Sequence, residues 1–228
     1  MFSQQNFINV PSSEVTTKKK IFFQQQLNFN ELIQSNTTLD FGLGGGFEIG
    51  VNVLGLNFSE NQQTFFHNDS SDIDPYNPLL SINALKQIKI KENIAISFGT
   101  QLGLNFETSK KKSEASLGYG NLSIKDVWKK NSTLVIGAYY NSKHYGGQGN
   151  RLGAWVGAEI PMLEKIHFMA ESVIGNNSLS YTSLGIIYYP IKWMPLTFGL
   201  AIPNTSSNSY SIVFELTIIP RVAKEEEE

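Results

Sequence analysis

The residues that could take part in chemistry are polar side chains at every second position of otherwise apolar segments. Charged groups withdrawn from bulk water must be paired or hydrated. If the face that they share encloses a lumen, two interpretations stay open: a network of salt bridges and hydrogen bonds that fills it, or a lining that selects among passing solutes. The residues on this face are Asp40, Glu48, Asn52, Gln101, Lys125, Lys143, Glu159, Glu171 and Glu215.

No pattern indicates catalysis, a metal ion or a cofactor. The histidines are His67, His144 and His167. They fall in two loops and near a turn, so neither a metal site nor a Ser-His-Asp arrangement is predicted. The loop with Asp69, Asp72 and Asp74 lacks the glycine and final glutamate of an EF-hand, so we expect a solvated loop. The chain has no cysteine, which excludes disulfides, thiolate zinc sites and cysteine nucleophiles.

These residues belong to a two-residue alternation, clearest between Asn93 and Phe106. One face carries Ile94, Ile96, Phe98, Thr100, Leu102, Leu104 and Phe106, and the other Ala95, Ser97, Gly99, Gln101, Gly103 and Asn105. Successive side chains of a strand point to opposite faces. A strand of this length extends about 43 Å, whereas a tilted strand crosses a bilayer with only ~9–11 residues. The alternation therefore predicts a transmembrane β-barrel.

About twelve such strands are expected, an even number as in single-chain bacterial barrels. Their ranges are Ile21–Phe29, Thr37–Gly44, Phe47–Phe58, Leu79–Ile90, Asn93–Phe106, Ser116–Trp128, Thr133–Lys143, Leu152–Ile160, Lys165–Gly175, Tyr181–Ile191, Leu196–Ile202 and Tyr210–Ile219. Short connections follow every second strand, and the other connections are longer. This asymmetry is typical of an outer-membrane barrel and places both ends of the barrel on the short-turn side. The register slips near Leu54, which indicates a β-bulge.

The polar face is expected to point inward. Twelve strands lined with isoleucine, leucine and phenylalanine would enclose a wide apolar void, since about eight strands already leave an interior that side chains just fill. Glycine weakens strands and brings no benefit on a solvent-facing wall, but small residues suit a concave one. The glycines of the polar face are Gly42, Gly50, Gly99, Gly103, Gly137, Gly153, Gly157, Gly185 and Gly199.

Overall composition agrees with a barrel and excludes other classes. The chain has 228 residues, a formal net charge of −2 and a mean hydropathy of −0.17. The charge balance gives no basis for binding nucleic acid, which usually needs a basic patch. No run of ~18 apolar residues exists, so no transmembrane helix is expected. Alternation halves the mean hydropathy of a barrel, so the low value does not argue against one.

Short motifs resemble a known class of protein. The stretches Asn9–Val15 and Lys20–Gln26 look like the mature start of outer-membrane barrels of the Bacteroidota. Residues Gly118–Ile124, Gly-Tyr-Gly-Asn-Leu-Ser-Ile, are similar to the Gly-x-Gly-Asp-Leu-Ser pattern of porin-like barrels, with Asn121 where aspartate is usual. Such barrels often end on an aromatic residue, whereas here Pro220 and a charged tail follow the last strand. The resemblance implies a place in the outer membrane and passive transport, and it brings no catalytic residues.

We therefore predict an all-β protein: a closed antiparallel up-and-down transmembrane barrel over residues 20–220. Residues 1–19 form a polar N-terminal tail or a plug of the lumen, and residues 221–228 a charged tail. The leading function is a porin-like channel in the bacterial outer membrane that passes small polar solutes and contacts membrane lipid, without a cofactor. The alternatives are a structural or adhesive barrel that acts through its outer loops, and a soluble lipid-binding barrel. An outer-membrane phospholipase is not expected, because no histidine lies mid-strand beside a serine on the apolar face.

Overall fold

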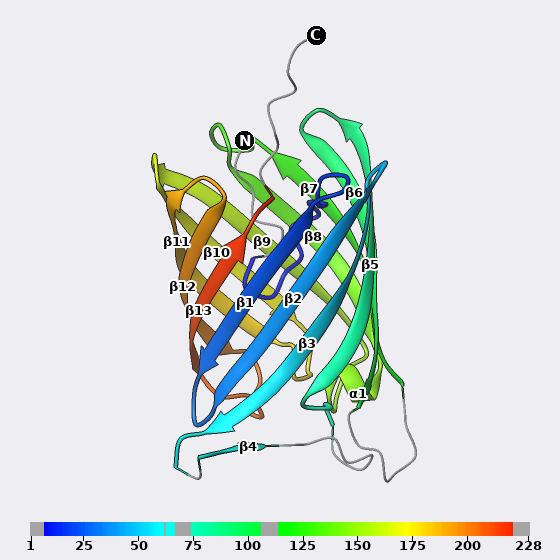
Figure 1. Ribbon diagram of the computed structural model, residues 1–228, viewed down its shortest axis with the longest axis vertical. Coiled ribbons are helices and arrows are strands. Elements are labelled where there is room, and N and C mark those ends of the chain that lie inside the picture. The colour runs from blue at the N-terminus through cyan, green and yellow to red at the C-terminus, as the bar shows by residue number, and fades with distance from the viewer. Residues whose placement is uncertain (1–6, 62, 67–73, 106–113, 221–228) are drawn as a thin grey trace.

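The computed structural model describes residues 7–61, 63–66, 74–105 and 114–220, and its strands form one antiparallel sheet that closes on itself (Figure 1). Twelve strands make the barrel, and a short extra strand, β4, pairs only with the end of β3. The barrel strands are β1 (Ile21–Phe29), β2 (Ile33–Gly44), β3 (Phe47–Ser59), β5 (Leu79–Lys91), β6 (Ile94–Asn105), β7 (Glu114–Lys125), β8 (Thr133–Asn141), β9 (Leu152–Leu163), β10 (Ile166–Ile174), β11 (Tyr181–Ile191), β12 (Met194–Pro203) and β13 (Ser211–Ile218). The remaining elements are β4 (Thr64–Phe66) and a single helical turn, α1 (Lys143–Gly146).

Each barrel strand pairs with its neighbours along the chain, and β1 pairs with β13 to close the ring, for example at Phe23 opposite Ile218. This is the up-and-down topology, and it confirms the predicted fold class. Tight turns connect β2 to β3, β5 to β6, β9 to β10 and β11 to β12 at one end. The longer connections, with β4 and α1, lie at the other end, at the bottom of Figure 1. The expected asymmetry between the two ends is therefore present.

The two faces of the wall differ as the alternation predicts. The outer face exposes large apolar side chains, among them Ile82, Phe98, Ile136, Ile186, Phe198 and Ile212. The inner face buries polar ones, among them Gln24, Asn52, Ser81, Ser97, Thr197 and Thr217. The polar face therefore points inward. Within the described residues, no helix is long and apolar enough to cross a membrane.

The register slip expected near Leu54 is also present. Ser35 of β2 pairs with Leu56 while Thr37 pairs with Val53, so β3 carries one extra residue at this point. Gly55 has a φ of 68°, a left-handed conformation that favours glycine. Its amide donates a 2.7 Å hydrogen bond to Oδ1 of Asn36, which holds the bulge in place.

Some strand ends differ from the prediction. Trp128 lies in a turn and not in a strand, because the Ser132 hydroxyl accepts hydrogen bonds from the amides of Trp128 and Lys129 and closes the turn. Lys143, expected on an inward strand position, begins α1 instead, since β8 ends at Asn141. The charged tail predicted at 221–228 lies outside the described residues.

Candidate functional site

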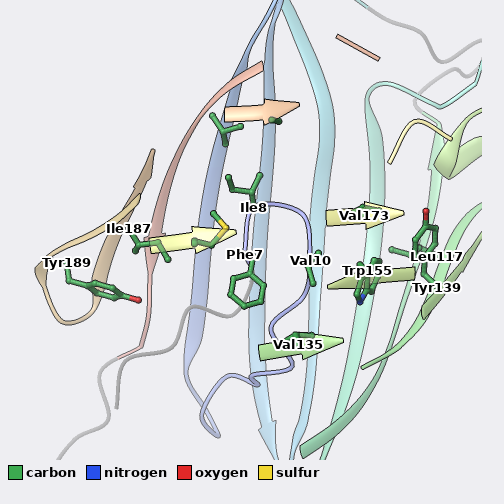
Figure 2. Packing of buried hydrophobic residues seen from close by; sticks show 13 residues of the cluster. Phe7, Ile8, Val10, Leu117, Val135, Tyr139, Trp155, Val173, Ile187 and Tyr189 are labelled. Atoms are coloured by element: carbon green, nitrogen blue, oxygen red, sulfur yellow. The ribbon is translucent and has the colours of Figure 1, made fainter. Parts of the chain in front are cut away.

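The barrel interior is the candidate site, because the chain from Phe7 to Thr17, here called the N-terminal segment, runs inside it. Phe7, Ile8 and Val10 are buried at 1%, 5% and 0% exposure. They share one apolar cluster with inward residues of the wall that include Val135 and Trp155. Figure 2 shows Phe7, Ile8 and Val10 on one thin stretch of chain close to the strands that carry Val135 and Trp155. The segment returns to the wall where the amide of Lys19 donates to the carbonyl of Gly42, 2.8 Å away.

Two inward carboxylates of the wall hold the backbone of this segment. Both oxygens of Glu171 accept from the amide of Asn9, at 2.9 and 3.0 Å, and Oε2 also accepts from the amide of Val10 at 3.0 Å. The Asn9 side chain donates to Oε1 of Glu171 at 2.8 Å. The amide of Thr16 donates to Glu48 at 2.6 Å. Amides without a strand partner need acceptors when they are buried, and these carboxylates supply them.

Side chains from three further strands bind the middle of the segment. Gln87 of β5 donates to the carbonyl of Ser13 at 2.6 Å, and the Ser97 hydroxyl of β6 donates to the Ser13 hydroxyl at 2.8 Å. Asn121 of β7 donates to the carbonyl of Pro11 at 3.0 Å. Lys125, also on β7, forms a 2.6 Å ion pair with Glu14. The segment is therefore bound around much of the inner circumference.

Glycines of the inner wall receive the apolar side chains of the segment. A Cβ atom on Gly157 would lie 2.6 Å from Cδ2 of Phe7, and one on Gly199 would lie 2.6 Å from Cδ1 of Ile8. Real Cβ atoms do not approach other atoms this closely. The segment therefore fits against the wall only because both positions are glycine. Of the inward glycines noted in the sequence, Gly157 and Gly199 are thus the contact surface of residues 7 and 8.

The inward polar residues form several separate groups. Asp40 and Asn52 are joined through Asn83, whose amide donates to both, at 2.8 and 3.2 Å. Glu159 does not meet Glu171 of the neighbouring strand; it lies 2.5 Å from Nδ1 of His167 and accepts from the Tyr189 hydroxyl at 3.0 Å.

The remaining residues of the predicted set have local partners. Glu215 is fully buried and accepts from the Thr217 hydroxyl at 3.3 Å. Gln101 accepts from the Tyr145 hydroxyl at 2.7 Å. Burial raises the pKa of Tyr145, so this hydroxyl keeps its proton and donates. Lys143 is half-buried, outside the barrel strands, and pairs with Asp74 at 2.8 Å.

Several residues of this interior were not among the lumen-lining residues predicted from the sequence. Asn83, Gln87, Ser97 and Asn121 obey the same parity as the predicted set, but small or neutral polar side chains give no signal that marks them as contacts. His167 was placed near a turn, yet it is the second residue of β10 and points inward, where its ring contacts that of Tyr189 at 4.7 Å. The alternation of inward and outward side chains, counted from Ile166, would have predicted this inward position.

A cavity of about 410 Å³ lies between the N-terminal segment and the long connections. Ile8 and Asn9 close one side of it, and residues of the connections, such as Asn77 and Asn208, form the other. Inward side chains of β1, β2, β7 and β9 make the walls between. The N-terminal segment therefore divides the interior, and this cavity is the part left on the loop side.

Neither a metal site nor a lipid-facing catalytic pair is formed by the described residues. They contain no group of three or more metal-ligating side chains. His67, Asp69 and Asp72 lie outside the described residues, and Asp74 pairs with Lys143 and His144. His167 is buried inside the barrel, and the His144 ring stacks on Tyr76 at 4.5 Å.

Solved structures share this fold. Neither a protein-family model nor a curated protein sequence matches the chain. A KdgM porin in complex with disordered oligogalacturonate aligns with a TM-score of 0.58 and 8% identity, covering 89% of this chain and 99% of that one. Another KdgM porin structure aligns with a TM-score of 0.57 and 7% identity, and it covers 89% of this chain and 99% of that one. Outer membrane phospholipase A from Escherichia coli aligns with a TM-score of 0.49 and 11% identity, and the alignment covers 88% of each chain. At these identities the likeness shows the fold alone: a closed antiparallel β-barrel like that of the KdgM porins.

Proposed function

We propose that this protein is a porin-like passive channel of the bacterial outer membrane for small polar solutes, which its N-terminal segment occludes. One observation carries the proposal: an apolar exterior surrounds a polar interior, and the segment inside is bound by reversible contacts. Hydrogen bonds and one ion pair hold residues 9–16 to the wall. Such contacts can open without breaking a covalent bond, so a passage through the barrel is compatible with this fold.

The outer surface supports the location. Isoleucine, leucine and phenylalanine side chains cover the strands around the barrel, for example Ile82 at 62% and Phe98 at 56% exposure. Soluble proteins rarely expose contiguous apolar surface on this scale, whereas a bilayer covers it. The motifs at Asn9–Val15, Lys20–Gln26 and Gly118–Ile124 support an origin in the Bacteroidota, hence in a Gram-negative outer membrane.

The fold supports passive transport over catalysis. The structural neighbours with the higher TM-scores are porins, and one of them was solved with oligogalacturonate. For this chain we propose small polar solutes as a class. We assign selection to the width left by the segment and to the inward charged residues at positions 40, 48, 125, 159, 171 and 215.

The test is single-channel conductance of the refolded protein in a planar bilayer, with and without residues 1–19. We expect few or small steps from the full chain and larger, more frequent steps from the truncated one, because the segment occupies the lumen. Circular dichroism and heat-modifiable migration on a gel confirm that both barrels are folded. Silence from both folded forms would contradict the channel and favour a structural barrel that acts through its loops.

A further inference from the structure

The cavity on the loop side of the N-terminal segment has two chemically different walls. Inward residues of β1 and β2 form an amide wall, defined as Asn28, Gln34 and Asn36. Rings from the other side of the barrel and from the connections form an aromatic wall, defined as Tyr76, Tyr145, Trp155 and Tyr181. In the ring of twelve strands, β9 with Trp155 lies across from β2, so the two walls face each other.

The amide wall has unused donors. Gln26 donates to Oδ1 of Asn28 at 2.8 Å, and Asn28 donates to Oε1 of Gln34 at 3.0 Å. This chain of amides ends at Gln34, whose own nitrogen has no partner among the described residues. Asn36 uses its oxygen to accept from Gly55, and its nitrogen likewise has no partner among those residues. Each side-chain amide nitrogen carries two N–H donors, so these two residues can donate to a ligand in the cavity.

In the aromatic wall, the polar groups of Trp155 and Tyr145 are occupied, whereas the buried Tyr76 hydroxyl has no hydrogen-bond partner among the described residues. The Trp155 indole donates to Asn121 at 2.6 Å, and the Tyr145 hydroxyl donates to Gln101 at 2.7 Å. Trp155 and Tyr145 therefore offer ring carbon to the cavity, not hydrogen bonds. Ring surfaces pack well against apolar C–H groups.

None of the described lining residues is acidic, basic or a histidine. The nearby Glu171 is occupied by the amides of Asn9 and Val10. A charged solute entering the cavity would lose water and gain no counter-charge, which is costly. An uncharged solute with many hydroxyl groups has no such penalty.

We propose that this cavity is a binding site for an uncharged saccharide of one or two rings. Sugar hydroxyls bind the amides of Gln34 and Asn36, and the C–H face of the sugar ring packs on Trp155. The volume of about 410 Å³ is at the small end of the usual range for ligand sites, roughly 300–1,000 Å³. This inference rests on the proposed function, since it names the class of solute that the channel takes up at its loop side.

The experiment uses Trp155 as the reporter. The chain has three tryptophans, so Trp128→Phe and Trp193→Phe leave Trp155 as the only one. The full chain, refolded in a detergent without a sugar headgroup, is titrated with maltose and, separately, with galacturonic acid. We expect a saturable change of Trp155 fluorescence with millimolar maltose and none with galacturonic acid. Calorimetric titration of the protein with all tryptophans in place repeats the measurement if the double replacement fails to fold.

A matched pair of variants locates the site. Gln34→Leu removes an amide from the cavity, and Gln25→Leu makes the same change on a neighbouring outward position of β1. Loss of a neutral hydrogen bond weakens binding roughly three- to tenfold, so we expect this from Gln34→Leu and no change from Gln25→Leu. No saturable maltose signal, equal binding of galacturonic acid, or equal loss in both variants would overturn the proposal.

The saccharide site and the channel can be refuted separately. Saturable maltose binding by a protein that gives no current would refute the channel and keep the saccharide site. Channel steps from a protein that binds no maltose would keep the channel and refute the saccharide site.

Discussion

At the scale of single residues, Glu171 shows how a buried carboxylate is stabilised without a cation. Both of its oxygens accept hydrogen bonds from Asn9 and Val10, which is the pattern of an ionised carboxylate. The wall supplies the acceptor and the N-terminal segment supplies the donors. Without the segment, the Glu171 carboxylate would be buried without donors, and without Glu171 the segment amides would be buried without acceptors. The interaction therefore couples the segment to the barrel.

Replacing Glu171 by glutamine should loosen the segment. The side-chain amide would present N–H groups to the N–H donors of Asn9 and Val10, so we expect a loss of roughly 1–3 kcal/mol in the free energy of unfolding. Urea unfolding in lipid vesicles measures it. Glu164→Gln, in an exposed turn, is the control. In a chain without residues 1–19 the Glu171→Gln loss should disappear, and its persistence would refute the coupling.

Gly157 makes a second prediction at this scale. In Gly157→Ala the new methyl group would lie 2.6 Å from the Phe7 ring, so the ring must move. Overpacking of this kind costs about 1–3 kcal/mol. Gly118→Ala is the matched control, because its Cβ would meet nothing within 4 Å. Equal unfolding free energies for the two variants would show that Phe7 does not pack against β9.

At the scale of elements, the connection between β3 and β5 is held over the loop end by one carboxylate. Asp74, buried at its side chain, pairs with Lys143 at 2.8 Å and with Nδ1 of His144 at 2.6 Å. The Tyr76 ring stacks on His144, and the Tyr76 amide donates to the carbonyl of His144 at 2.9 Å. The connection is thereby fastened to α1, at the rim of the cavity.

Replacing Asp74 by asparagine should free this connection. Asparagine keeps one accepting oxygen but carries no charge, so Lys143 and His144 would no longer share a carboxylate. Local opening should become easier while the strands stay intact. We expect proteinase K to cleave the refolded variant severalfold faster between β3 and β5. Glu60→Gln removes a charge from the exposed start of the same connection and should not change the rate. Equal cleavage of Asp74→Asn and the parent would refute the role of this contact.

At the scale of the whole molecule, the apolar exterior determines the solvent in which the barrel is stable. An outward Phe98 near the middle of β6 is 56% exposed to the surroundings. Only a bilayer makes such a surface favourable around a complete ring of strands.

Phe98→Lys should therefore destabilise the barrel in lipid by roughly 2–4 kcal/mol, the cost of lysine at the bilayer midplane. Leu163→Lys, at the outward end of β9 beside a turn, should cost only about 0–1 kcal/mol. Urea titrations of folding into vesicles give both values. If Phe98→Lys were neutral and made the protein soluble without detergent, the barrel would be a soluble lipid-binding one.

The sequence by itself determined the wall of this protein. Period-two alternation is a local property, so β1 and β11 were predicted with their observed ends, and the inward direction of Glu171 and Glu215 followed from parity and barrel size. The ends of β7 and β8 were wrong, because the hydrogen bonds of Ser132 and the turn of α1 outweigh the strand pattern at Trp128 and Lys143.

Only the tertiary structure decided what fills the interior. Asn9 and Glu171 are 162 residues apart, and their contact depends on the path of a segment that has no periodicity of its own. Glu159 meets His167 and not Glu171, because the stagger of neighbouring strands sets which inward side chains share a level. The cavity has the same origin: its amide wall comes from β1 and β2, and its aromatic wall from β9, β11 and two connections, which no local pattern relates.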